Sequence, residues 1–246
     1  MLVAAAVCPC PPLLVPEIAT GAAPELDAAR AACADAVGLL AAARPDRLYV
    51  VGPTPGGARG TYPAGAVGSF AGFGVDLSVR LGEGAAADHD ARPAEEAHDR
   101  ALPTSLAVGA WLLGRAGWAD APIEGLGVDE TAAPDVCAGL GRGLAASAER
   151  VALLVMGDGS ACRTVKAPGY LDERAEGFDA AAARALGAAD GAALLALDTE
   201  LADELKAAGR APWQVLAGAA EGAGLDGRLL FEDAPYGVGY FVAAWS

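Results

Sequence analysis

Short apolar runs alternate along the chain with longer segments in which apolar residues recur at helical spacing. The strand-like runs cover 2–7, 48–51, 75–81, 123–128, 151–156, 227–233 and 237–245, and the helical patterns cover 24–43, 104–116, 134–149, 173–186, 199–208 and 213–222. This alternation is typical of helices packed on both faces of a mostly parallel sheet. No segment resembles an interdomain linker and no internal repeat is found. We therefore predict one α/β domain, residues 1–246, with three layers in the order α/β/α.

The run 151–156, Val-Ala-Leu-Leu-Val-Met, is the strongest strand signal because it is apolar on both faces, as a central parallel strand is. It opens into Gly157-Asp-Gly-Ser160. The first apolar run is too short for a signal sequence or a membrane span, and Pro11, Pro12 and Pro16 follow it at once. We therefore expect a buried first strand and a cytoplasmic protein.

The chain is strongly acidic, with 32 acidic and 17 basic residues and a formal net charge of −15. A nucleic-acid backbone or an anionic membrane surface would be repelled by this charge, and no basic run offers an exception. We predict no nucleic-acid partner and no membrane association. The cysteines number five, which is odd, and a cytoplasmic location keeps thiols reduced. Free thiols or metal ligands are thus favoured over disulfides.

Two glycine-containing turns resemble known motifs, but each lacks residues that its motif requires. Residues 52–57 have the outer glycines of a phosphate-binding loop, but Ala58-Arg59 stands where Lys-Ser/Thr is required. Ser160 follows a strand, but Gly157-Asp-Gly-Ser-Ala161 lacks the second glycine of a nucleophile elbow. Nucleotide binding and a serine hydrolase triad are therefore not favoured.

Five segments, in the same order along the chain, resemble the catalytic chain of the class III extradiol ring-cleavage dioxygenases and the related Memo family. Cys10-Pro-Pro-Leu-Leu-Val-Pro-Glu17 is similar to the family's His-Pro-Pro-Leu-Leu-Val-Pro-Glu, and Val50-Val-Gly-Pro-Thr54 to its strand ending in Ser-Pro-His. Gly68-Ser-Phe-Ala-Gly-Phe-Gly74 is similar to Gly-Asp-Phe-x-x-Phe-Gly. Gly157-Asp-Gly-Ser160 resembles Gly-Asp-x-Ser-His, and Pro235-Tyr-Gly-Val-Gly-Tyr240 resembles Pro-Phe-Gly-Val-Gly-Tyr. The resemblance implies the family's three-layer fold.

The same resemblance implies that the family's iron site is lost. That site holds ferrous iron with two histidines and one carboxylate, and a further histidine acts as general acid and base. The two ligand positions fall on Cys10 and Thr54, the acid/base position falls near 102–104, and the histidine after Gly-Asp-x-Ser falls on Ala161. Only the carboxylate is kept, as Asp233 or its neighbour Glu232. We therefore expect no iron-dependent ring cleavage.

Both histidines of the chain, His89 and His98, lie in the polar segment 82–100. His98 is close in sequence to the missing acid/base position, and one hypothesis makes His98 and Asp158 the catalytic pair. The alternative is an exposed histidine in an acidic loop.

Cysteines end or follow two of the predicted strands. Cys8 and Cys10 end the first strand, and Cys162 follows the strand that ends at Met156. Because strand ends in such sheets converge on one edge, these thiols together with Asp233 and Glu232 form a candidate site for zinc or ferrous iron. The alternative is a set of small buried thiols that fill space and need no cofactor.

Three hypotheses for function follow. In the first, a divergent relative of the dioxygenases binds a small acidic or aromatic molecule, or a partner, with Thr54, Ser160, Arg163 and Tyr236 as ligand-binding residues. In the second, an oxidoreductase or other metal-dependent enzyme uses a rebuilt Cys/Asp/His site. In the third, the chain is an interaction module with a homo-oligomer face.

Overall fold

A seven-stranded sheet runs through the middle of the protein in the order β3-β6-β2-β7-β1-β9-β8. The computed structural model describes residues 1–19, 21–54, 59–82 and 100–246. The inner strands β6, β2, β7 and β1 are parallel, and β3, β9 and β8 add antiparallel pairings at the two sides. The strands are β1 (Leu2–Cys8), β2 (Arg47–Thr54), β3 (Gly60–Tyr62), β6 (Ile123–Asp129), β7 (Val151–Met156), β8 (Gly227–Asp233) and β9 (Tyr240–Trp245).

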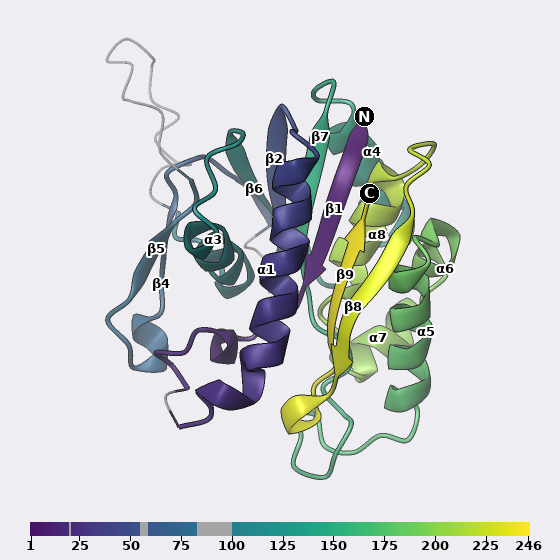
Figure 1. Ribbon diagram of the computed structural model, residues 1–246. Helices are drawn as coiled ribbons and strands as arrows, with labels where there is room; N and C mark the ends of the chain where they lie inside the picture. The colour runs from purple at the N-terminus through teal and green to yellow at the C-terminus, as the bar shows by residue number, and fades with distance from the viewer. Residues whose placement is uncertain (20, 55–58, 83–99) are drawn as a thin grey trace.

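Helices cover both faces of this sheet (Figure 1). One face is covered by α1 (Asp27–Ala42) and α3 (Thr104–Arg115), and the other by α4 (Pro134–Ala145), α5 (Ala175–Gly187), α6 (Gly191–Leu195), α7 (Thr199–Glu204) and α8 (Arg210–Ala219). The predicted three-layer α/β/α architecture with a mostly parallel centre is therefore confirmed. A small separate hairpin joins β4 (Val67–Ser69) to β5 (Ser78–Arg80).

Side-chain alternation along the inner strands divides the apolar core in two. In β1, Ala4, Ala6 and Cys8 pack with α1 and α3, whereas Ala5 and Val7 pack with the helices of the opposite face. Every residue of β7 is buried, because both of its faces are covered in this way. The unbroken apolar run 151–156 is thus explained by its central place in the sheet.

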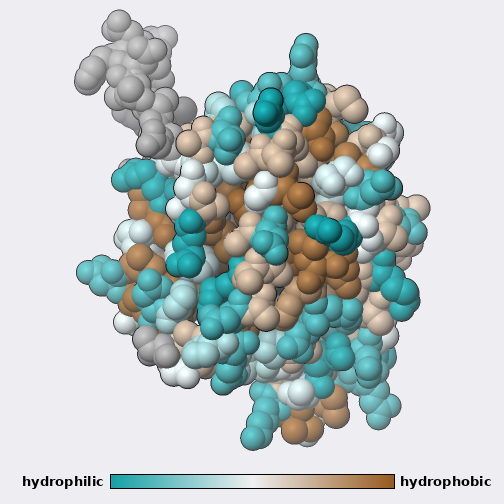
Figure 2. Space-filling view, viewed as in Figure 1, coloured by the Kyte–Doolittle hydropathy of each residue, from teal (hydrophilic) through white to brown (hydrophobic). Residues whose placement is uncertain are grey.

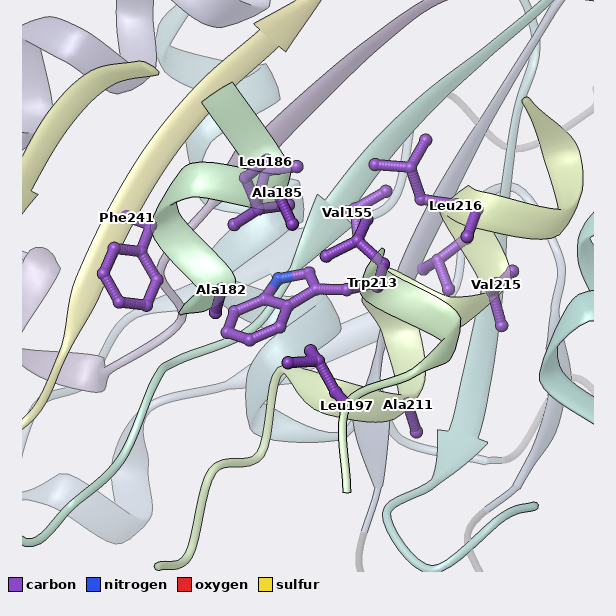
Figure 3. Packing of buried hydrophobic residues seen from close by; sticks show 14 of the residues in the cluster. Val155, Ala182, Ala185, Leu186, Leu197, Ala211, Trp213, Val215, Leu216 and Phe241 are labelled. Carbon is purple, nitrogen blue, oxygen red and sulfur yellow. The ribbon is translucent and has the colours of Figure 1, made fainter. Parts of the chain in front are cut away.

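Trp213 of α8 fills the centre of one of these cores (Figure 3). Its indole contacts the ring of Phe241 from β9 edge-on, with 5.9 Å between the ring centroids. Leu186 and Val155 surround it from α5 and β7 (Figure 3). Such an aromatic anchor ties α5 and α8 to the sheet, because it removes a large apolar area from water. On the outside, hydrophilic and apolar side chains are mixed, with an apolar area near the centre of the view (Figure 2).

The element bounds agree with the predicted ones at 151–156 and 227–233, and they differ elsewhere for local reasons. The first helix begins at Asp27 and not at residue 24, since Ala23–Leu26 forms a 3-10 turn that contains Pro24. The segment predicted as a strand over 75–81 is shorter and lies outside the main sheet, as β5. The helix predicted over 213–222 begins at Arg210, because Pro212 is tolerated in a first helical turn.

Some elements are not predicted by the pattern. The short strands β3 and β4 and the five-residue helix α6 are each too short to show a period. The predicted polar segment 82–100 falls almost wholly outside the described residues. Within the described ranges, no helix combines the length and the apolar character needed to cross a membrane.

Candidate functional site

The carboxyl ends of the parallel strands meet at one edge of the sheet, the lower edge in Figure 1. There Cys8 is in register with Met156, and Thr54 with Asp129. The antiparallel strand β9 begins at the same edge, where Tyr240 is in register with Asp233. Open α/β sheets bind their ligands outside this edge.

Cys10 and Asp158 lie in direct contact just beyond the ends of β1 and β7. The backbone N–H of Cys10 donates to Oδ1 of Asp158 at 2.8 Å, and Cys10 Sγ lies 3.8 Å from Oδ2, within hydrogen-bond range for sulfur. Burial raises the pKa of the Asp158 carboxyl to about 7. The hydrogen bonds from Cys10 lower this pKa, but by less than burial raises it. Burial, and then the charge of Asp158, raise the pKa of the Cys10 thiol well above its ordinary value. Cys10 is thus a protonated thiol at neutral pH and not a nucleophilic thiolate.

Tyr240 completes this group from the first position of β9. Its side chain is 1% exposed. Burial raises the pKa of its phenol above the ordinary value, and the neighbouring Asp158 and Cys10 raise it further. We call Cys10, Asp158 and Tyr240 the strand-end site. Sequence reasoning missed Tyr240, because it reads simply as the first residue of an apolar strand.

Asp158 is held in place by backbone hydrogen bonds from two other segments. Gly209 N–H donates to the carbonyl of Asp158 at 2.7 Å, and Gly157 N–H donates to the carbonyl of Cys8 at 2.9 Å. On the other side, Gly159 N–H donates to Gly239 O at 2.7 Å, and Gly239 N–H donates to Ser160 O at 2.8 Å. The loop after β7 is therefore fixed directly against the segment that leads into Tyr240.

A second aspartate, Asp179 of α5, anchors the same loop from beneath. Its fully buried carboxylate accepts hydrogen bonds from the backbone N–H of Ser160 at 2.7 Å and from Ser160 Oγ at 2.8 Å. Arg163 forms an ion pair with it at 3.2 Å. Any side chain at Gly159 or Gly239 would collide with this carboxylate, with a Cβ 2.7 Å and 2.6 Å from its oxygens. Burial raises the pKa of Asp179, and the hydrogen bonds and Arg163 oppose that rise.

Asp179 gives two of the predicted ligand-binding residues an internal role. Ser160 is fully buried and bonded to Asp179, and Arg163 is neutralised by the same carboxylate. Sequence reasoning missed Asp179 as well. The signal that could have found it is its position among alanines on the buried face of a helix, where an aspartate is unusual unless it is paired.

The other two predicted ligand-binding residues also have protein partners. The Thr54 hydroxyl is fully buried and donates to Val128 O at 3.2 Å. Tyr236 is exposed, has a left-handed φ of 59°, and donates its hydroxyl to Glu25 Oε2 at 2.8 Å. Thr54 and Tyr236 thus lie at the predicted edge, but their hydroxyls are engaged.

The thiols of the predicted metal site do not gather. Hydrogen bonding with Cys33, more than burial, raises the pKa of Cys8, and Cys8 and Cys10 pack on the α1 side of the sheet. Cys162 packs in the core of the opposite face, with its thiol 3.5 Å from Leu205 O. The expected convergence of Cys162 with Cys8 and Cys10 is therefore wrong, because its turn leads the chain under the sheet towards α5 and α7.

The predicted carboxylate ligands are exposed. Glu232 and Asp233 end β8 at the predicted edge of the sheet, and Asp233 Oδ1 accepts a hydrogen bond from the next backbone N–H, that of Ala234, at 2.7 Å. In the described part of the chain, no three Cys, His, Asp or Glu side chains are placed to hold a metal ion. His98, predicted as catalytic, and His89 lie outside the described residues. Among the described residues the donor set of Cys10, Thr54 and Asp233 does not fit ferrous iron.

The fold and the strand-end site define a three-layer α/β protein with a thiol, a carboxyl and a phenol at the carboxyl edge of its sheet. The structure is similar to the crystal structure of uncharacterized protein JW3007 from Escherichia coli K12, with a TM-score of 0.55 and 16% sequence identity. The similarity covers 99% of this chain and 100% of the other. No protein-family model matches the chain, and no curated protein matches it. At this identity the likeness concerns the fold alone.

Proposed function

We propose that the chain is a divergent relative of the class III extradiol dioxygenases that binds a small molecule at the strand-end site and does not carry out iron-dependent ring cleavage. One observation carries the proposal. Positions 10 and 54, where the resemblance would place iron-binding imidazoles, hold a thiol bonded to Asp158 and a fully buried threonine bonded to Val128 O.

These two positions offer poor ligands to iron for a physical reason. Ferrous iron of this type needs imidazole and carboxylate donors with free lone pairs. The Cys10 thiol keeps its proton because burial and Asp158 oppose the thiolate. The Thr54 hydroxyl is a weak neutral donor without solvent contact. With Asp233 exposed and turned to its own backbone, the described residues leave no group of three ligands.

Ligand binding is supported by the rigid frame around the site. The loop after β7 is held by Gly209, Gly239 and Asp179, so the Asp158 carboxyl is oriented before any ligand arrives. A preorganised polar group costs less conformational entropy on binding than a mobile one. The hydrogen-bonding groups of the site are thus poised for a small molecule at the sheet edge.

The experiment has two parts. Protein incubated anaerobically with ferrous iron is mixed with catechol or protocatechuate and dioxygen, beside an active extradiol dioxygenase as positive control. We expect no yellow ring-fission product from this chain, and turnover would contradict the proposal. A thermal-shift panel of uncharged, basic and acidic aromatic compounds then tests binding, since a ligand of the folded state raises the melting temperature. Loss of the response in Asp158→Asn would assign it to the strand-end site.

A second candidate is acid–base chemistry at the same site. It is favoured by the Asp158 pKa of about 7, since a general acid or base works best when its pKa is near the operating pH. In this version Asp158 exchanges a proton with a bound substrate in a rebuilt site with Cys10 and Asp233; the fourth residue of that hypothesis, His98, lies outside the described residues. Zinc binding is tested by comparing the zinc content of wild type and of Cys10→Ser, both purified without chelator. Equal, near-zero zinc in the two proteins would contradict it.

A further inference from the structure

The Tyr240 hydroxyl is a buried polar group without a hydrogen-bond partner among the described residues. Its side chain is 1% exposed. Among the described residues, two side-chain atoms have neither contact with solvent nor a hydrogen-bond partner, namely Arg210 Nε and Trp213 Nε1. Tyr240 Oη is not one of these fully enclosed atoms. The hydroxyl therefore keeps a contact with solvent while the ring is enclosed. Buried hydroxyls are normally satisfied, so this hydroxyl, which no described residue satisfies, has hydrogen-bonding capacity left for a ligand.

The phenol cannot easily turn away from this position. Tyr240 is the first residue of β9 and is in register with Asp233 of β8. The residue before it, Gly239, is bonded on both sides to the loop after β7, through Gly159 N–H and Ser160 O. Tyr240 is consequently fixed beside the Asp158 carboxyl.

The groups around the hydroxyl are acidic. The pKa of Tyr240 is raised by burial, by Asp158 and by Cys10, and that of Cys10 by burial, by Asp158 and by Glu130. A nearby cation would lower these values, and none of the described residues does so for Tyr240, Cys10 or Asp158. Once Asp158 has lost its proton, its negative charge is therefore not balanced by any described cation.

The guanidinium groups of two neighbouring segments are already engaged. Arg163 is paired with Asp179 at 3.2 Å. Arg210 is 2% exposed and donates to the carbonyl oxygens of Glu130 and Ala132 and, at 2.9 Å, to Gln214 Oε1. Neither is left to bind a carboxylate ligand. The expectation of an acidic ligand therefore loses the support that Arg163 gave it.

We propose that Tyr240 is a ligand-contacting residue and that it acts with Asp158 to select small amines over carboxylates. The inference rests on the proposed binding function and names its ligand class. The protonated amino group donates to the Asp158 carboxylate and to Tyr240 Oη, and the acidic surroundings stabilise its charge. A carboxylate would meet Asp158 and Glu130 with no counter-cation from the described residues.

The test uses benzylamine, benzyl alcohol and benzoate, which share one ring and differ in charge, in binding titrations at pH 8. We expect benzylamine to bind most tightly and benzoate not to bind. Tyr240→Phe keeps the ring and removes the hydroxyl, and should weaken benzylamine binding roughly tenfold, as expected for the loss of a charge-assisted hydrogen bond. Tyr170→Phe, at a side chain that is 65% exposed, is the matched control and should bind as wild type does.

Carbon-13 labelling of the tyrosine Cζ atoms gives a readout on the wild-type protein, so that the test survives if Tyr240→Phe is unstable. Of the five tyrosine signals, the one from Tyr240 should shift with benzylamine and not with benzoate. An unmoved signal, benzoate binding as tight as benzylamine binding, or no benzylamine binding would overturn the inference. The uncharged members of the thermal-shift panel still test the proposed binding function in that case, so the two failures are distinguishable.

Discussion

Asp158 and Asp179 show how environment gives the same side chain two different roles. Asp179 is fully buried and satisfied by Ser160 and Arg163, so its charge is compensated and its role is to hold the loop. Asp158 receives its side-chain hydrogen bonds from Cys10, and none of the described cations lies beside it. A partly buried carboxyl without a cation favours its protonated form. That difference favours Asp158 over Asp179 as the group that would exchange a proton with a ligand under the proposed function.

Asp158 should make the stability of the protein depend on pH. Its folded pKa of about 7 lies above the unfolded value, so the folded state holds this proton longer. Its contribution to stability is therefore fully present below about pH 4 and is lost as pH rises through about 7. Asp158→Asn removes this loss, and from pH 4 to pH 8 its stability relative to wild type should rise by roughly 4 kcal/mol, since the pKa is raised by about three units and each unit corresponds to about 1.4 kcal/mol.

Urea unfolding of both proteins across that range measures the difference. Cys10 and Tyr240, the titratable groups whose pKa values Asp158 raises, have pKa values raised by burial as well, so they keep their protons across that range in both proteins. Asp35→Asn, at an exposed position of α1, is the control and should run parallel to wild type. Parallel curves for Asp158→Asn as well would show that Asp158 is ionised throughout.

At the scale of elements, α4 and α8 approach each other through glycines. A Cβ at Gly141 would lie 2.0 Å from Val215 O, and a Cβ at Gly218 would lie 2.2 Å from Ala138 O. The two helix backbones are thus in direct contact, and this contact positions the first turn of α8 beneath the loop that carries Asp158. A similar approach brings Gly209 against Gly157, where a Cβ on Gly157 would be 2.5 Å from Gly209 Cα.

Two substitutions two residues apart in α4 should therefore have opposite effects. Gly141→Ala places a methyl group against backbone that cannot move aside, and should destabilise the protein by about 2 kcal/mol or more, as overpacking does. Gly143→Ala meets nothing within 4 Å and should stabilise it by about 0.5–1 kcal/mol, because alanine is the better helix former. Chemical denaturation of the two variants decides the point. Equal effects of the same sign would mean that the helices are further apart than described.

At the scale of the whole molecule, the sheet separates two apolar cores, and all five cysteines lie in or beside them. Cys10 is 8% exposed, and Cys8, Cys33, Cys137 and Cys162 are 2% exposed or less. Burial raises the pKa of Cys137 and of Cys162. Buried protonated thiols react slowly, because the thiolate is the reactive form.

A thiol reagent should therefore label the native protein slowly and the unfolded protein completely. In guanidinium chloride we expect five thiols to react at once with Ellman's reagent. In buffer we expect no fast phase, and Cys10 should be the first to react, as mass spectrometry of the labelled peptides would show. Fast labelling of Cys33 or Cys137 under native conditions would contradict the packing of the two cores.

The layered fold was predictable because periodicity is a local property of the chain. The run 151–156 is apolar on both faces wherever it lies, and such a strand requires helices on both sides. The edge of the sheet that holds the site was predictable for the same reason, since Cys10, Asp158 and Asp233 each follow a strand. Local patterns did not reveal the short elements β3, β4 and α6.

Which side chains meet at that edge was decided only by the tertiary structure. Cys10 and Asp158 are far apart in sequence, and Tyr240 reaches them from a third segment that reads as plain strand. Cys162 follows the right strand, yet its chain turns to the other face of the sheet. Periodicity specifies the faces of each element, whereas contacts between distant segments depend on how whole elements pack, as in the glycine contacts between α4 and α8. The sequence alone therefore determined the layers and the site's edge, and packing determined the residues that form the site.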